Sequence, residues 1–215
     1  MKKLDRQVPQ VQEKSARKAP ITERELMDAA ISLLDSHRSV SSLSLREIAK
    51  AAGIAPNSFY RHFRDVNELA VALIDQAGRG LRGIIREARR RLNDGSGGIR
   101  ASVEVFMEQL DSEQKYLHIL LREMSIGSEA FRQAVDRELR YFEDELRDEL
   151  EKIATAQNGR IYQPQLVAKA ITRLVFAQGA SAADLSPAER HAVIEETTIM
   201  VRMIIHGARG LAEAK

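Results

Sequence analysis

The segment Ser44–Phe63 constrains the fold more than any other stretch, because it carries the signals for two short helices separated by a tight turn. Ser44 and Glu47 have the three-residue spacing of a capping box, which predicts the start of the first helix. Gly53 supplies the left-handed conformation that ends this helix. Pro56 suits the first turn of a second helix, where a missing N–H costs nothing. The sequence therefore predicts a helix-turn-helix.

The second helix of this motif has an inward and an outward face. Phe59 and Phe63 are four residues apart and are expected to point toward the core. The polar residues around them form a candidate DNA-contacting set: Arg46, Asn57, Ser58, Tyr60, Arg61, His62 and Arg64. A helix from Pro56 to His62 would be about 10 Å long and would fit the major groove, where Arg61 is the candidate for a bidentate guanine contact. Taken singly, each residue has an alternative interpretation as an ordinary exposed side chain.

Charge is distributed unevenly along the chain. Residues 1–64 hold 12 Lys and Arg against 7 Asp and Glu, a net charge of +5, and the remainder holds 21 against 24, a net charge of −3. A basic head on a slightly acidic body is typical of a nucleic-acid-binding protein. Residues 1–20 lack apolar periodicity, so they are predicted to form a flexible basic arm that either lies along DNA or is a solvated tail.

Helical periodicity continues to the end of the chain. Thr22 and Glu25 form another capping box and predict a helix before the motif, so residues 21–64 are expected to form a three-helix DNA-binding head. Ser186 and Glu189 give the same signal at the start of the last helix. Residues 65–215 are expected to form a helical effector-binding and dimerisation body, opened by a long helix beginning at Asp65. Outside the motif, the predicted helices cover residues 22–36, 65–92, 99–110, 112–124, 128–156, 165–181 and 187–210. The chain is therefore predicted to be all-α with about nine helices.

Composition argues against several other classes of protein. The chain has no run of 18 apolar residues, and its charged N-terminus does not read as a signal peptide, so we expect a cytoplasmic protein that does not enter a membrane. Zero cysteines exclude disulfides and thiolate metal sites. The histidines are scattered without the spacing of metal ligands, and no constellation of catalytic groups is apparent. We therefore expect no enzyme activity, no metal and no required cofactor.

The motif is similar to the DNA-binding signature of the TetR family of bacterial repressors. The matching residues are Gly53, Ser58-Phe59-Tyr60 and His62-Phe63, with Leu45-Arg46-Glu47-Ile48-Ala49 before them and Glu68-Leu69 after them. The resemblance covers residues 22–75 by motif and extends to the whole length through the nine-helix plan. Residues 42–47 and 53–66 resemble, more narrowly, the FabR and DesT type of regulators. One departure is Val66, where many family members carry a basic residue that meets a phosphate; Arg64 or backbone N–H groups would have to serve instead.

This resemblance implies a homodimer that reads a palindromic operator in double-stranded DNA and associates with the nucleoid when bound. The last two helices would form the dimer interface, and a fully buried core helix is the alternative interpretation of their apolar residues. The candidate interface residues are Leu174, Val193, Thr197, Met200, Val201 and Ile204. A ligand would change DNA affinity by favouring one spacing of the two recognition helices, near 34–36 Å or a multiple of it.

The resemblance to the FabR and DesT type also implies control of unsaturated fatty acid synthesis or desaturation genes, with a long-chain fatty acyl-CoA or related acyl thioester as effector. The candidate pocket residues are Phe106, Met107, Leu110, Tyr116, Leu120, Phe131, Val135, Phe142 and Phe176, and the alternative is that most are core. Arg79, Arg82, Arg86 and Arg90 are either a solvated basic face or partners for coenzyme A phosphates. The acidic run 143–151 is predicted to be a solvated face.

Two other functions stay open at this point. One is a TetR-type repressor of an efflux or catabolic operon that responds to another apolar small molecule. The other is a helical enzyme or scaffold in which the motif is incidental.

Overall fold

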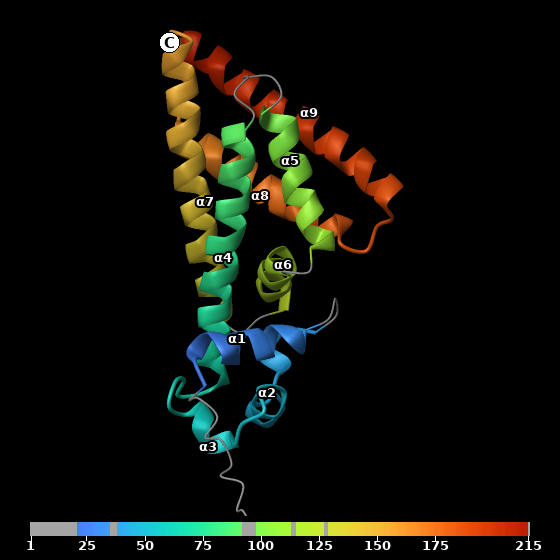
Figure 1. Ribbon diagram of the computed structural model, residues 1–215. Coiled ribbons are helices and arrows are strands. Elements are labelled where there is room, and N and C mark those ends of the chain that lie inside the picture. Colours follow the sequence, from blue (N-terminus) through green and yellow to red (C-terminus); the bar gives the residue numbers. More distant parts are fainter. Residues whose placement is uncertain (1–20, 35–37, 92–97, 113–114, 127–128, 215) are drawn as a thin grey trace, which may run out of the picture.

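The computed structural model describes residues 21–34, 38–91, 98–112, 115–126 and 129–214. Within these ranges the chain forms nine α-helices, two short 3-10 helices and no β-strand (Figure 1). The elements are α1 (Glu23–Ser32), η1 (Val40–Ser42), α2 (Leu45–Ala51), α3 (Pro56–Phe59), α4 (Val66–Arg91), α5 (Gly98–Glu108), η2 (Gln109–Asp111), α6 (Tyr116–Ile126), α7 (Glu129–Ala156), α8 (Pro164–Ala182) and α9 (Pro187–Glu213). The all-α prediction is confirmed. The arm predicted for residues 1–20 lies outside the described residues.

The head consists of α1, α2 and α3 and occupies one end of the molecule (Figure 1). Both longer helices of the head begin at the predicted capping boxes. At α1, Glu25 N donates to Thr22 Oγ1 (3.2 Å) and Thr22 N donates back to Glu25 Oε2 (2.7 Å). Ser44 and Glu47 make the same reciprocal pair of bonds at α2, at 3.3 and 2.9 Å. These bonds satisfy N–H groups that the first turn of a helix leaves without partners.

The long helix α4 joins the head to the body and lies beside α7 (Figure 1). Leu69 and Leu73, in its first turns, are buried in a hydrophobic core that also contains Ile48 and Phe59 of the head. The same core continues to Phe131 of α7. Head and body therefore share one core across the start of α4.

The remaining helices complete the body. α8 packs between α7 and α9, and α9 also crosses α5. A second, smaller apolar cluster holds α7, α8 and α9 together at the end of the molecule farthest from the head, and consists of Leu150, Val167, Ala168, Ile171, Val201 and Ala208. This end of the body surrounds the cavity described below.

Outside the helix-turn-helix motif, three predicted helix boundaries differ from the structure by three residues or more. α1 ends at Ser32 rather than near residue 36, because the N–H groups of the next two residues close tighter three-residue bonds to Ala30 and Ile31 (3.1 and 3.0 Å). α6 begins at Tyr116 rather than near residue 112, because Lys115 has a left-handed backbone with φ of 52°. α9 runs to Glu213, beyond the predicted end at 210.

Candidate nucleic-acid interface and ligand cavity

The turn between α2 and α3 has the geometry that the sequence predicts. Gly53 has φ of 66°, in the left-handed region where a side chain would be strained. Its N–H donates to Lys50 O (3.1 Å), and Ile54 N donates to Ala49 O (3.0 Å). This pair of bonds is a Schellman motif, which ends α2 and sets the direction in which α3 leaves it.

The second helix of the motif is shorter than predicted. α3 covers Pro56–Phe59 instead of extending to His62. Beyond Phe59 the chain tightens, since Arg61 N bonds Ser58 O at 3.4 Å and His62 N bonds Phe59 O at 3.0 Å, in a three-residue pattern. This tightening turns the chain so that Phe63 packs into the core.

Two buried aromatic rings anchor the outward-facing residues. Phe59 and Phe63 are 0% and 3% exposed, and their ring centroids are 5.8 Å apart. Tyr60 lies edge-on to Phe59 but is 60% exposed. Of the other predicted DNA contacts, Arg46, Asn57, Arg61 and Arg64 are exposed, and Ser58 and His62 are half-buried. Five of the seven predicted residues are therefore exposed, and Ser58 and His62 are partly accessible.

The charges beside this set are partly paired. Glu47 accepts a bond from Arg38 (2.7 Å) while it caps α2. The Ser44 hydroxyl, Arg38 and the Ser44 backbone together lower the pKa of Glu47 to about 2, so this carboxylate stays ionised at neutral pH. Arg64 lies 3.3 Å from Glu68 in an exposed ion pair, which is weak enough to exchange for a phosphate. Val66 is half-buried against the core and offers no charge.

A cavity of about 350 Å³ lies in the body between α4, α5, α7, α8 and α9. Phe106, Phe142 and Phe176 form one wall, with centroids 5.0 Å apart for Phe106 and Phe176 and 5.4 Å apart for Phe142 and Phe176. Most other lining residues are aliphatic, and four can supply polar contacts: Ser102, Glu149, Thr172 and Arg209. A depression of about 720 Å³ shares Ile99, Ile205 and Arg209 with this cavity.

The predicted pocket residues divide into two groups. Phe106, Phe142 and Phe176 line the cavity. The others lie elsewhere in the body: Met107, Leu120, Phe131 and Val135 are buried in the main core, Tyr116 packs against that core, and Leu110 borders a smaller cavity near the head. Some aliphatic wall residues, such as Ile99 and Leu146, are not in the predicted pocket set, although they are periodic apolar positions in the sequence. Arg209 carries no such signal.

The arginines predicted as one face of α4 divide between solvent and interior, since Arg79 and Arg86 are exposed and Arg82 is buried. Arg82 is 9% exposed, and it donates to Glu138 of α7, which is 2% exposed. Its guanidinium carbon is also 4.9 Å from the centroid of the Tyr141 ring. Arg86 pairs with Glu145. Both interpretations offered for Arg82 are therefore wrong, because its charge is already neutralised inside the protein; the side chain of the predicted Arg90 lies outside the described residues.

The prediction of a solvated acidic face on α7 is also wrong at one position. Glu143 is 4% exposed, and its Oε1 lies 3.3 Å from Arg173 Nε of α8. This ion pair contributes to the packing of α7 against α8.

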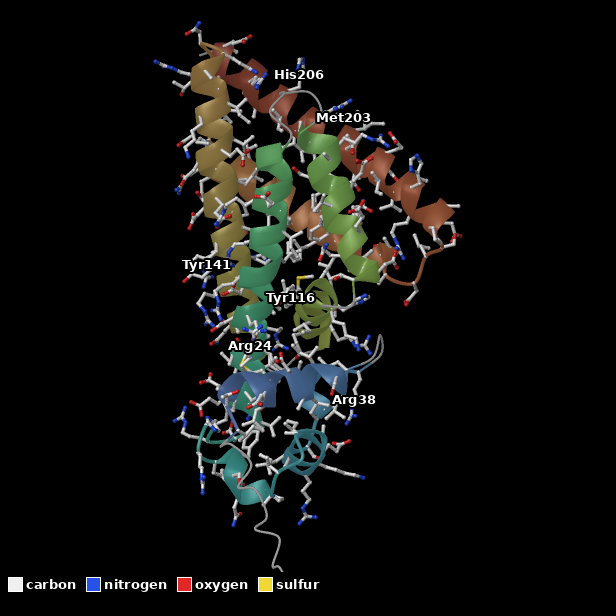
Figure 2. The ribbon with its side chains drawn as sticks, viewed as in Figure 1. Arg24, Arg38, Tyr116, Tyr141, Met203 and His206 are labelled. Atoms are coloured by element: carbon white, nitrogen blue, oxygen red, sulfur yellow. The ribbon has the colours of Figure 1, made fainter. Side chains whose placement is uncertain are left out.

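The predicted dimer residues lie on several sides of their helices. Thr197 and Val201 are buried within the chain, and Leu174, Val193, Met200 and Ile204 are half-buried. The large apolar side chains that remain exposed on α8 and α9 are Leu166, Ile199, Met203 and Leu211. Met203 and His206 lie on α9 at the end of the molecule opposite the head (Figure 2).

Within the described ranges, no helix is both long and apolar enough to cross a membrane.

Comparisons with known proteins agree with this geometry. A model of the bacterial regulatory proteins of the tetR family matches residues 26–73. A protein of Haemophilus influenzae described as an uncharacterized HTH-type transcriptional regulator is 42% identical over 187 residues, which cover 87% of this chain and 90% of that protein.

Solved structures of similar fold include a transcriptional regulator from Rhodococcus sp. RHA1, with a TM-score of 0.69 at 17% identity, covering 88% of this chain and 98% of that one. FadR of Thermus thermophilus, a TetR-family repressor solved with lauroyl-CoA, has a TM-score of 0.64 at 20% identity, covering 86% of this chain and 94% of that one. At these identities the likeness concerns the fold alone.

Proposed function

The chain belongs to the TetR family of bacterial regulatory proteins, and from this membership we propose that it is a dimeric, ligand-responsive repressor of unsaturated fatty acid synthesis or desaturation genes. Family and relatives are transcriptional regulators rather than enzymes. In this proposal the head binds a palindromic operator in the cytoplasm. The body binds a long-chain acyl-CoA or a related acyl thioester, and no other cofactor is required.

The exposed residues around α3 support the DNA-binding part of the proposal. Tyr60 and Arg61 directly follow Phe59, the fully buried last residue of α3, so packing of Phe59 restricts where they lie. A bidentate contact from Arg61 to guanine contributes about 1–3 kcal/mol of discrimination between bases. One such short element reads few base pairs, and a dimer doubles the site.

The cavity is the observation that carries the choice of effector. At roughly 30 Å³ per water-sized group, its 350 Å³ holds about a dozen non-hydrogen atoms, so the rest of a long acyl chain would extend into the adjoining depression. Its walls are predominantly apolar, and Arg209 stands where the cavity adjoins the outer depression. An amphiphile with an apolar tail and an anionic head group matches the apolar walls and the arginine at their edge. The Thermus FadR complex supports the proposal to the extent that a protein of this fold is solved with an acyl-CoA.

Exposed side chains on α8 and α9 support the dimer. Leu166 is 58% exposed and Met203 is 67% exposed, although both are large and apolar. Ile199 and Leu211 are exposed as well, and a second copy of the chain would cover these apolar side chains. We therefore shift the proposed interface from the buried Thr197 and Val201 toward these exposed residues.

Fluorescence anisotropy with the DNA upstream of the gene tests this function. The protein is expected to bind this duplex in a salt-dependent manner, and palmitoyl-CoA and oleoyl-CoA are expected to change the operator affinity in opposite directions. Coenzyme A without an acyl chain is the control and should have no effect. An identical response to both thioesters refutes the opposing-response mechanism, and no response to either refutes acyl-CoA sensing. Native mass spectrometry of the purified protein would then reveal a different bound molecule.

A further inference from the structure

Helix α6 of the body contacts the connection between α1 and α2 of the head, and lies next to α1 (Figure 1). Glu123, near the end of α6, is fully buried with 0% exposure. Its Oε1 accepts hydrogen bonds from Ser39 Oγ (2.5 Å) and from Val40 N (2.7 Å). A carboxylate of the body therefore binds the start of η1, which leads into the helix-turn-helix.

The partners of Glu123 are themselves buried and ordered. Ser39 is 4% exposed and Val40 is 1% exposed. The Ser39 hydroxyl accepts a bond from Ser41 N (3.1 Å), so it caps η1 while it donates to the carboxylate. Hydrogen bonds to an ionised acceptor in a water-excluded site are stronger than those at a surface.

A second polar contact lies beside this one. Lys115, just before α6, donates to Leu34 O at the end of α1. A cation at a helix C-terminus and an anion at a helix N-terminus are both favourable arrangements. The start of α6 therefore binds the end of α1, and Glu123 binds η1.

Both hydrogen bonds that the described residues donate to the Glu123 carboxylate come from the head. Its Oε2 is buried without a hydrogen-bond partner in the described part of the chain, and it borders a cavity of about 210 Å³ between head and body. A buried charge held only by the neighbouring lobe is expensive to leave unpaired. Because both bonds end on one oxygen, a shift of α6 relative to η1 affects both of them.

The same helix reaches toward the large cavity. Phe106 belongs to the cavity wall and lies against Gly179 of α8, where an added Cβ would be 2.8 Å from Phe106 Cε1 and 3.7 Å from Leu121 Cδ1. Leu121 is two residues before Glu123 on α6. A single helix thus adjoins a wall residue of the cavity and bonds the head.

We propose that Glu123 is the positioning residue that links the state of the body to the geometry of the DNA-binding head. With Glu123 bonded to Ser39 and Val40, α6 and the head move as one unit; once α6 shifts, the head is released. This inference rests on the proposed function of a DNA-binding regulator, and it assigns the coupling to one carboxylate.

Hydrogen exchange tests the link without knowledge of the effector, because coupling between two sites is reciprocal. A duplex is first selected by the wild-type protein from a random pool. Binding of this duplex should slow amide exchange in α6 of the wild type by about fivefold or more. In Glu123→Leu, which removes the oxygen that accepts both bonds, the protection should be confined to the head. Ser125→Ala, a change on the same helix whose hydroxyl bonds only Leu121 O among the described residues, should behave as the wild type.

Three outcomes overturn the inference or the function beneath it. Protection of α6 in Glu123→Leu equal to that in the wild type refutes the role of Glu123. Protection confined to the head of the wild type refutes coupling through α6. If no duplex is selected, the proposed function fails, and this inference fails with it. Should Glu123→Leu lose its circular dichroism signal, Ser39→Ala removes the hydroxyl donor while leaving α6 unchanged, and the same comparison decides.

Discussion

Gly78, in the middle of α4, is a position where the smallest possible change should have a large effect. A Cβ added there would lie 2.5 Å from Glu138 Cδ and 2.6 Å from Glu138 Cγ, far inside van der Waals contact. Glu138 is 2% exposed and pairs with the buried Arg82, so it has little room to retreat. We expect Gly78→Ala to separate this ion pair.

The magnitude follows from two opposing effects. Loss of a buried ion pair costs about 3–5 kcal/mol, and the lower end applies because Arg82 keeps Glu145 at 3.8 Å. Alanine favours a helix interior over glycine by about 1 kcal/mol. The net expectation is a decrease of about 2 kcal/mol in the free energy of unfolding.

Urea denaturation measures this change, and Gly83→Ala is the matched control. Gly83 lies in the same helix, and an added Cβ there would meet nothing within 4 Å. The control should therefore stabilise the protein by up to about 1 kcal/mol. If Gly78→Ala stabilises the protein as much as Gly83→Ala does, the added methyl group has not separated Arg82 from Glu138, and the expected destabilisation is refuted.

Further predictions concern the head, the proposed dimer and acid stability. Arg61→Ala should weaken binding to a specific duplex by about tenfold or more and non-specific binding much less; equal losses would restrict Arg61 to phosphate contact. Met203→Glu should shift the sedimentation of the protein toward a monomer without lowering its helix content, and an unchanged dimer would exclude this surface. The pKa of Glu47 is lowered to about 2, so its contribution to the free energy of unfolding is complete above the pKa of an ordinary glutamate and is lost as pH falls toward 2. The difference in urea midpoint between the wild type and Glu47→Gln should therefore be constant above pH 5 and disappear near pH 2, whereas a constant difference at all pH values would contradict the assignment.

Local signals in the sequence predict much of the fold. The capping boxes at Thr22, Ser44 and Ser186 each form and each start a helix, because their bonds join residues only three positions apart. Gly53 is predictable for the same reason, since its conformation depends on the helix that it ends.

Features that depend on contacts between residues far apart in the sequence could not be predicted from local patterns. Arg82 is buried because Glu138, 56 positions away, lies opposite it across the α4–α7 contact. The same limit applies to the cavity: apolar periodicity identifies Leu120 and Phe142 equally, and only the packing of the helices places Phe142 in the wall and Leu120 in the core. The end of α3 was misplaced because the chain tightens to bring Phe63 into the core of the head.

The shared core at the start of α4 also bears on attempts to recombine this protein with its relatives. A chimera joined at residue 65 would keep Ile48 and Phe59 from one parent but take Leu69 and Leu73 from the other, although the four belong to one core. Such a graft would mismatch side-chain volumes at the seam. Exchange of DNA specificity should therefore carry the first turns of α4 along with the head, so that the unit of exchange is a packed core segment and not a length of sequence.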